Sequence, residues 1–192
     1  MFDLIQKSLT EAEKTLQAFI TNNHNLETID KIADLIAEAF ERDNKVIIFG
    51  NGGSMCDAMH FAEELAGHFR QNRKALPAIA LSDPSFITCV ANDFGFEEIF
   101  ARGVEAYAQA GDIVVGISTS GNSLNVIKGL QKALSLDCFT VALLGGNGGK
   151  IAGTCDFELI VPSFATDRVQ EIHTMIIHIL LENIENRLFA YI

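Results

Sequence analysis

Five short apolar runs, most of them ending at glycine or serine, constrain the fold of this chain more than any other feature. They are KVIIFG (45–50), PAIALS (77–82), DIVVGIS (112–118), FTVALLGG (139–146) and FELIVP (157–162). The runs are continuously apolar, and helix-like segments separate them. Strands of this kind are buried on both faces, as in a parallel sheet between two layers of helices. The pattern predicts a doubly wound, flavodoxin-like α/β fold.

The remaining apolar periodicity predicts helices at both ends of the chain. The first helix has an apolar face of Phe2, Ile5, Leu9, Leu16, Phe19 and Ile20, and the second one of Ile29, Ile32, Leu35, Ile36 and Phe40. The stretch TNNHN (21–25) separates them as a turn, and a last helix is expected over about 167–189. We therefore expect one domain, 1–192, with a helical hairpin at 1–43 and an α/β core with the C-terminal helix at 44–192. Because nothing obvious covers the hairpin's apolar faces, a helix-mediated oligomer is also expected.

Composition narrows the class of protein. The chain has 192 residues, 48 % of them hydrophobic, and a formal net charge of −11, which disfavours a nucleic-acid surface. The four cysteines show no CxxC spacing and are interpreted as small buried residues in a reducing compartment. The N-terminus lacks an apolar signal core, and no apolar run is long enough to cross a bilayer. A cytoplasmic protein without membrane or nucleic-acid partners is expected.

The segment STSGNS, at the end of the third predicted strand, is the strongest ligand-binding motif. It places Ser118, Thr119, Ser120 and Ser123 around a glycine at the start of a helix. Helix N-termini offer free backbone amides to anions, and the hydroxyls add donors. Plain helix capping by Ser120 or Asn122 is the alternative, but four hydroxyls exceed what a cap needs. Without a Walker lysine, the motif favours a sugar phosphate and no nucleotide cofactor.

A second turn of the same kind, GNGGS, follows the first predicted strand. Gly52 and Gly53 permit close backbone approach to a ligand, and Asn51 offers an amide. Alone this turn is weak evidence for binding, since any tight strand-to-helix turn can use it. Parallel strands end at one edge of the sheet, where α/β proteins bind ligands. Together the two turns predict a substrate pocket at that edge.

Two helices carry residues suited to a metal or to proton transfer. His60 and Glu64 lie four residues apart and share a helix face, which suits a divalent metal, most simply zinc, although such a pair is more often a surface pair. Glu63 is expected to face elsewhere. On the last helix, His178 lies in the apolar stretch MIIHILL. It is either a satisfied core histidine or, with Gln170, it meets His60 and Glu64 across a cleft.

Asn92 and Asp93 form one further polar pair. They end an apolar helical turn in the segment SDPSFITCVANDFGF (82–96). They either contact a polyol substrate or simply form a turn before the next segment.

In combination, GNGGS…HFAEEL, ANDFGF, GISTSGNS and RVQEIHTMIIH resemble the phosphoheptose isomerases, or sedoheptulose 7-phosphate isomerases, of the sugar isomerase (SIS) fold group. The resemblance covers nearly the whole chain. It implies a homotetramer with active sites between subunits. It also implies conversion of sedoheptulose 7-phosphate to D-glycero-D-manno-heptose 7-phosphate, which begins the synthesis of nucleotide-activated heptose for the lipopolysaccharide core.

The resemblance also implies a role for each matching position. The phosphate cradle would be Ser118, Thr119, Ser120 and Ser123. Further substrate contacts would be Asn51, Gly52, Gly53, Glu64, Asn92, Asp93 and Gln170. One zinc ion per subunit would be held by His60, Glu64, Gln170 and His178. Glu64 and His178 would be the catalytic acid/base pair of an enediol isomerisation, with the direction of each proton transfer left open.

Other functions remain to be weighed against this one. Non-catalytic SIS tetramers exist that regulate replication initiation, and a phosphosugar sensor would use the same phosphate loop. Isomerases of pentose or hexose phosphates also share the loop. The presence of Glu64 with Gln170 and His178 favours the enzyme. One departure from the family pattern is His68, which stands where members have an arginine.

Overall fold

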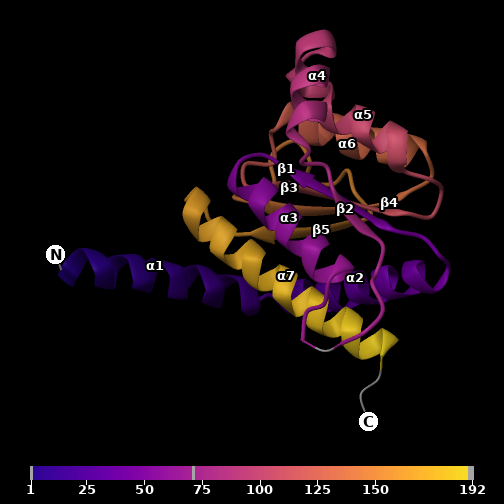
Figure 1. Ribbon diagram of the computed structural model, residues 1–192. Coiled ribbons are helices and arrows are strands. Elements are labelled where there is room, and N and C mark those ends of the chain that lie inside the picture. Colours follow the sequence, from indigo (N-terminus) through magenta and orange to yellow (C-terminus); the bar gives the residue numbers. More distant parts are fainter. Residues whose placement is uncertain (1, 71, 190–192) are drawn as a thin grey trace.

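The computed structural model describes residues 2–70 and 72–189, and its centre is a five-stranded sheet (Figure 1). The strands are β1 (Val46–Gly50), β2 (Ala78–Ala80), β3 (Ile113–Ser118), β4 (Phe139–Gly145) and β5 (Phe157–Val161). All neighbours pair in parallel, in the order β2-β1-β3-β4-β5. This is the strand order of doubly wound, flavodoxin-like folds. The fold predicted from the five apolar runs is confirmed.

Helices cover both faces of the sheet (Figure 1). One face carries α2 (Asn23–Glu41), α3 (Gly53–Ala66) and α7 (Thr166–Leu188), and the other carries α4 (Pro84–Phe94), the 3₁₀ turn η1 (Phe96–Glu98), α5 (Ile99–Tyr107) and α6 (Leu124–Ser135). Successive residues of β1 enter opposite cores, Ile48 among α2, α3 and α7 and Phe49 among α4, α5 and α6. This explains the continuous apolar runs, because each strand side chain is buried whichever way it points.

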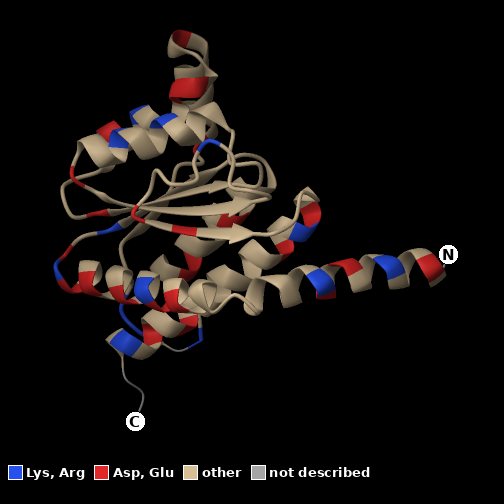
Figure 2. Ribbon diagram, turned by 180° about the vertical axis from the view of Figure 1, so that it is seen from behind, with Lys and Arg blue, Asp and Glu red and all other residues tan. Residues whose placement is uncertain are grey.

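The N-terminal region is helical, as predicted, but it is not a hairpin. Helix α1 (Phe2–Ile20) and α2 are separated only by residues 21–22, and Asn22 caps α2 by accepting from the backbone N–H of His24 at 3.2 Å. Figures 1 and 2 show that α1 extends away from the N-terminal end of α2 and does not fold back along that helix. The buried end of α1, at Phe19, joins the core of α2 and α7, and Arg168 of α7 donates to the Ser8 carbonyl at 2.8 Å. Packing against α7 therefore sets the direction of α1.

The outer half of α1 exposes much of the predicted apolar face. Phe2, Ile5 and Leu9 are 88 %, 55 % and 67 % exposed. Within one chain nothing that the structure describes covers them, as the sequence pattern anticipated. None of the helices in the described part of the chain is long and apolar enough to span a membrane.

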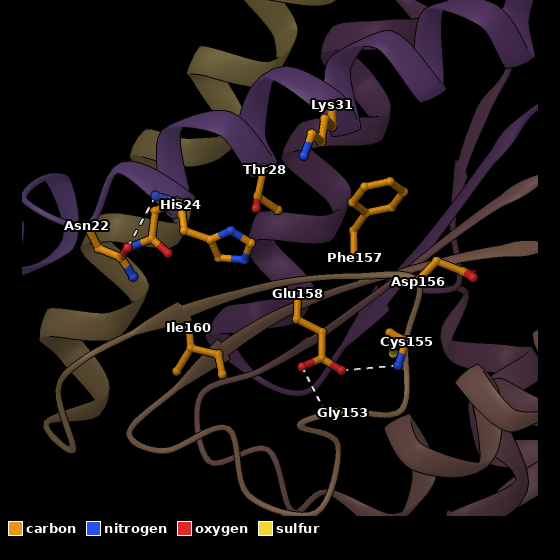
Figure 3. A pocket seen from close by; sticks show the side chains of 11 residues that line it. Asn22, His24, Thr28, Lys31, Gly153, Cys155, Asp156, Phe157, Glu158 and Ile160 are labelled. Carbon is orange, nitrogen blue, oxygen red and sulfur yellow. Dashed lines mark hydrogen bonds between the residues drawn. The ribbon is translucent and has the colours of Figure 1, made fainter.

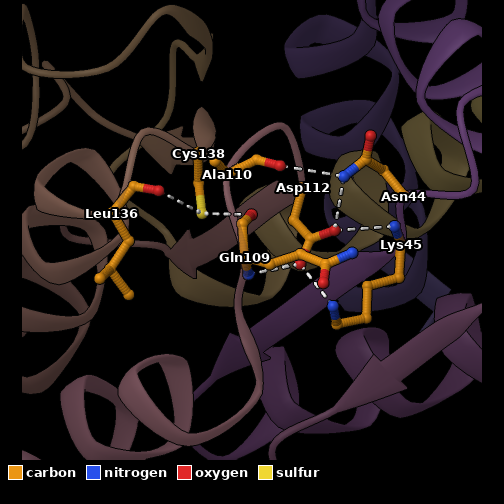
Figure 4. A network of polar contacts seen from close by, with 7 residues as sticks. All are labelled: Asn44, Lys45, Gln109, Ala110, Asp112, Leu136 and Cys138. Carbon is orange, nitrogen blue, oxygen red and sulfur yellow. Dashed lines mark hydrogen bonds and ion pairs between the residues drawn. The ribbon is translucent and has the colours of Figure 1, made fainter.

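At the amino-terminal edge of the sheet, a buried carboxylate joins β1 to β3 (Figure 4). Asp112 is fully buried, accepts the backbone N–H of Lys45 at 3.0 Å and that of Gln109 at 2.8 Å, and pairs with the Lys45 ammonium at 2.6 Å. The Asn44 amide donates to it at 3.1 Å. These bonds align the two central strands at the end opposite the predicted pocket.

The cysteines follow the sequence prediction only in part. Burial raises the pKa of the Cys138 and Cys155 thiols to about 11, so both are inert at neutral pH. Cys155 is only half-buried, however, and Cys56 and Cys89 are exposed, so the prediction that all four are buried holds fully for Cys138 and is wrong for Cys56 and Cys89. Both lie on the outer sides of helices, where a small side chain needs no packing partner.

Candidate active site

A pocket of about 300 Å³ lies at the carboxyl ends of β1 and β3. The two strands pair there, Gly50 opposite Ile117, and the chain leaves them toward opposite faces of the sheet, into α3 and α6. Such a switch point opens a crevice, which is where α/β sheets bind ligands. The pocket is lined by Asn51, Gly52, Gly53, Ser54, Ile117, Ser118, Thr119, Ser123, Thr166 and Gln170. The structure therefore brings both predicted turns together, and Gln170 with them.

The hydroxyls of STSGNS divide between two tasks. Ser118 is buried, accepts the backbone N–H of Gly121 at 3.1 Å and donates to the Ser123 hydroxyl at 3.2 Å. Ser123 occupies the N-cap position of α6, yet its side chain makes no capping bond. Ser123 and Thr119 thus present hydroxyls to the pocket beside the first amides of α6. Ser120 is exposed and accepts from the Asn122 N–H at 3.2 Å. It therefore serves the turn before α6, and the helix capping weighed for it in the sequence is not seen, because the N-cap residue is Ser123.

An amide pair links the two turns across the switch point. Asn51 donates to the Asn125 carbonyl oxygen at 2.9 Å, and Asn125 donates back at 2.8 Å. Asn125 also accepts the N–H of Val126 at 2.9 Å and is 3 % exposed. The Asn51 side chain therefore aligns the turn after β1 with the start of α6. The sequence carries no signal for Asn125, since the pairing spans 74 residues.

Below the pocket, two histidines meet between α3 and α7. The Nε2 atoms of His60 and His178 are 2.9 Å apart, and the rings lie edge to face. A Glu64 carboxylate oxygen is 3.9 Å from His60 Nε2. Of the predicted meeting of His178 and Gln170 with His60 and Glu64, the structure thus shows the contact between His178 and His60. The core histidine of α7 is His173, which is fully buried against the Leu144 carbonyl at 3.0 Å, and burial lowers its pKa to about 4.

The donors at the histidine pair fit a zinc ion. Glu63 lies 3.2 Å from Nδ1 of His60, so the expectation that it faces elsewhere is wrong; residues three apart on a helix are neighbours. A carboxylate at Nδ1 can orient the ring so that Nε2 is the nitrogen available to a metal. Two imidazole nitrogens and the Glu64 carboxylate are ligand types that zinc prefers. His60, Glu63 and Glu64 also place possible ligand atoms within 4.8 Å of one another.

Helices α3 and α7 run in the same direction. Their contacts follow one another along both helices, starting at the pocket. The predicted ligand Gln170 lies at the top, against Gly53, whose hypothetical Cβ would stand 2.5 Å from the Gln170 amide nitrogen. His178 lies two turns farther, about 12 Å along the helix axis. The structure thus places Gln170 in the pocket at the switch point, about two helical turns from the histidine pair, and its role as a metal ligand stays a prediction.

Between these two levels lies a carboxylate that the sequence analysis missed. Asp57 is 8 % exposed and accepts from the Thr174 hydroxyl at 2.8 Å, while its second oxygen is buried without a partner among the described residues. Burial raises the pKa of Asp57, and the Thr174 hydrogen bond and nearby His60 oppose that rise. The sequence signal that could have identified Asp57 is its position three residues before His60, which places both on one face of α3.

Comparison with known proteins gives the family. The chain matches the SIS domain over residues 9–145. It is 54 % identical to a phosphoheptose isomerase of Fusobacterium nucleatum, covering 97 % of this chain and 96 % of that protein, and 50 % identical to one of Vibrio cholerae, covering 97 % and 98 %. The chain belongs to the phosphoheptose isomerase family. A solved phosphoheptose isomerase from Neisseria gonorrhoeae superposes with a TM-score of 0.90 at 37 % identity, covering 96 % of this chain and 98 % of that one.

Two residues that the family resemblance assigns to substrate lie outside the pocket of a single chain. Asn92 and Asp93 are exposed on α4, where the Asn92 amide donates to the Asp93 carboxylate at 2.7 Å. Neither lines the hollow at the switch point. Their role in substrate binding stays a prediction.

A larger hollow, of about 460 Å³, lies between the start of α2 and the segment leading into β5 (Figure 3). Its main carboxylate, Glu158, already accepts from the backbone N–H groups of Gly153 at 2.9 Å, Thr154 at 2.9 Å and Cys155 at 3.1 Å. The hollow flanks the amino-terminal end of an edge strand, away from the carboxyl edge of the sheet where ligands bind. The smaller pocket is therefore the candidate active site of this phosphoheptose isomerase family member.

The close contact of Gly53 with Gln170 gives a testable prediction. We expect Gly53→Ala to fold normally, because the atoms that the new methyl group meets belong to the end of a flexible side chain. Gln170 must then swing out of the pocket, which costs about one hydrogen bond to substrate and raises KM about 5- to 10-fold. The same substitution in a Gln170→Ala background should have no further effect on KM. An unchanged KM in the single variant would contradict a substrate contact by Gln170.

Proposed function

We propose that this chain is an isomerase that converts sedoheptulose 7-phosphate to D-glycero-D-manno-heptose 7-phosphate, the first step toward nucleotide-activated heptose for lipopolysaccharide. The observation that carries the proposal is the arrangement of α3. Its N-terminus lines the pocket proposed to hold the phosphate, and its later turns carry Glu64 and His60, which contacts His178. About 10 Å of helix separates Gly53 from His60, a distance that an extended sugar phosphate bridges.

The proposed mechanism assigns each end of the substrate to one level of the site. Thr119, Ser123 and the first amides of α6 bind the phosphate and so position the distant reacting carbons. Glu64 accepts a proton from C1 of the ketose while His178 donates one to the oxygen on C2, which gives the enediol. Return of a proton to C2 and loss of one from the C1 hydroxyl gives the aldose. The same net proton transfers result if Glu64 and His178 exchange the roles of base and acid.

We also propose that zinc is held by His60, Glu64 and His178, with Gln170 as the fourth predicted ligand. When bound, it would stabilise the negative charge that develops on the enediolate oxygens. A side chain that is bound to the metal is not free to transfer a proton at the same moment, and this applies to both Glu64 and His178. The turnover assay described below therefore tests whether the metal is catalytic or structural.

The assembly proposed is a homotetramer. The exposed apolar face on the outer half of α1 supports it, because a second copy would bury Phe2, Ile5 and Leu9. The cytoplasmic location and the lack of nucleic-acid and membrane partners stay predictions. A non-catalytic SIS regulator or sensor is not favoured, since the Fusobacterium nucleatum and Vibrio cholerae relatives, 54 % and 50 % identical to this chain, are both named as isomerases.

The proposal is tested by turnover of sedoheptulose 7-phosphate with purified protein, before chelation, after chelation and after zinc is added back. We expect turnover that chelation removes and zinc restores. Turnover that survives chelation would keep the isomerase and make the metal structural or absent. No turnover with intact phosphosugar binding would move the chain to the regulatory class.

The phosphate cradle is tested separately by Ser123→Ala. Loss of one hydroxyl donor to a charged phosphate should raise KM roughly 10-fold and change kcat little, because the lost contact is equal in ground and transition states. Ser135→Ala is the matched control, since its hydroxyl donates to the Lys132 carbonyl at the far end of α6. An effect of Ser123→Ala confined to kcat would argue against a phosphate cradle.

A further inference from the structure

A buried ion pair outside the pocket connects the elements that carry the histidine–carboxylate site. Arg73, in the connection between α3 and β2, pairs with Glu185 of α7 at 2.6 Å. Their side chains are only 2 % and 3 % exposed. Burying two charges carries a large desolvation penalty, which only good geometry and further hydrogen bonds offset. The partners of the remaining donors and acceptors therefore show what the pair does.

The other donors of Arg73 bind the end of α3. Nη2 donates to the Glu64 carbonyl at 2.8 Å and Nη1 to the Leu65 carbonyl at 2.8 Å. The last carbonyls of a helix lack intrahelical partners and carry partial negative charge. The guanidinium thus caps the C-terminus of α3, and Nη1 also donates to the Lys74 carbonyl at 3.0 Å. One of the helix residues whose carbonyl it binds is Glu64 itself, the proposed base.

The other acceptors of Glu185 bind the chain just after α3. Its carboxylate accepts the backbone N–H of Phe69 at 3.4 Å and that of Arg70 at 3.5 Å. The Phe69 ring in turn stacks on His178, with centroids 5.9 Å apart and planes 18° from parallel. Glu185 lies on α7 two turns beyond His178. One buried ion pair therefore joins the backbone of Glu64, the aromatic wall of His178 and the helix that carries His178.

We propose that Arg73 and Glu185 are positioning residues that hold Glu64 and His178 at a fixed separation, an inference that rests on the proposed function. Acid–base groups and metal ligands act only within about 0.5 Å of their working geometry, which residues outside the site must maintain. Glu64 and His178 lie on different helices, so their separation depends on how α3 is anchored to α7. The Arg73–Glu185 pair is that anchor at the C-terminal end of α3.

The decisive variant is Arg73→Met/Glu185→Leu, which removes both charges and leaves none unpaired, a replacement that folded proteins often tolerate. We expect a near-normal thermal midpoint, zinc affinity about 10- to 100-fold weaker by competition with a chelator, and a kcat lowered by a similar factor. KM should change less than about 3-fold, because the phosphate cradle lies at the other end of α3. A folded double variant with normal zinc affinity and kcat would overturn the proposal.

Two further variants keep the test decisive if the double variant does not fold. Arg73→Lys keeps the charge beside Glu185 but lacks the planar fork that reaches the Glu64 and Leu65 carbonyls, so it should also weaken zinc binding about 10-fold. Normal zinc affinity in this variant would count against the proposal. Arg187→Met is the matched control on the same helix; it removes ion pairs to Asp30 and Asp34 of α2 and should lower the thermal midpoint only.

One readout depends on neither zinc nor turnover. Stacking on Phe69 shifts the NMR resonance of the His178 ring proton Hε1, and this shift should diminish in the full-length double variant or in Arg73→Lys. An unchanged resonance would overturn the proposal. If the wild-type protein does not turn over sedoheptulose 7-phosphate, the proposed function fails, while this measurement still decides whether Arg73 and Glu185 position His178.

Discussion

Glu64→Gln is expected to fold normally and to lower kcat about 10²- to 10⁴-fold, the usual contribution of a positioned general base. Glutamine keeps the shape of the side chain but cannot accept the carbon-bound proton. Glu64 is only partly exposed and lies beside His60, so its carboxylate is placed for this transfer. The measurement is steady-state turnover of sedoheptulose 7-phosphate, with zinc content determined on the same samples.

A neighbouring carboxylate provides the control for this prediction. Glu171→Gln alters an exposed acid on α7 that contacts Arg168 at 3.1 Å, about two helical turns before His178. It should keep wild-type kcat and zinc content. Wild-type kcat in Glu64→Gln would exclude Glu64 as the base. A low kcat with normal zinc content would separate its proton-transfer role from its role as a ligand.

His178→Ala is expected to lose both turnover, on the order of 10³-fold in kcat, and bound zinc. The imidazole is the partner of His60 at 2.9 Å, and its removal leaves His60 and Glu64 as the remaining donors at that level. Metal content and kcat are measured together. His24→Ala, on α2 near the larger hollow, is the control and should change neither quantity.

The three informative outcomes of His178→Ala differ in meaning. Unchanged zinc content with lost turnover would remove His178 from the ligand set and leave it as an acid or base. Loss of zinc with turnover retained would make the metal dispensable for the chemistry. Only loss of both supports one site in which metal binding and proton transfer use the same imidazole.

Local sequence patterns were sufficient for the fold and for the pocket that the two turns share. A run such as DIVVGIS is apolar at every position because both faces of β3 are buried, and that requirement can be read residue by residue. The turns GNGGS and STSGNS follow adjacent parallel strands, so the general rule for strand ends predicted their common pocket. The spacing of His60 and Glu64 placed them on one helix face without knowledge of anything else.

Other features depend on contacts between segments far apart in the sequence. The pairs His60–His178, Asn51–Asn125 and Arg73–Glu185 are separated by 118, 74 and 112 residues. Periodicity identifies which face of a helix is buried but not which residue of another helix it meets. That choice depends on the relative shift of α3 and α7, which the packing of both helices on the sheet determines.

By itself, the sequence determined the parallel α/β architecture, the pocket at the switch point and the type of chemistry available there, because each follows from burial or hydrogen bonding within a few residues. Only the tertiary structure decided that His178 meets His60 while His173 is buried in the core, that Ser120 serves the turn, and that α1 extends outward instead of folding into a hairpin. Each of these outcomes depends on what a distant element presents at the point of contact, and local propensity carries no information about that.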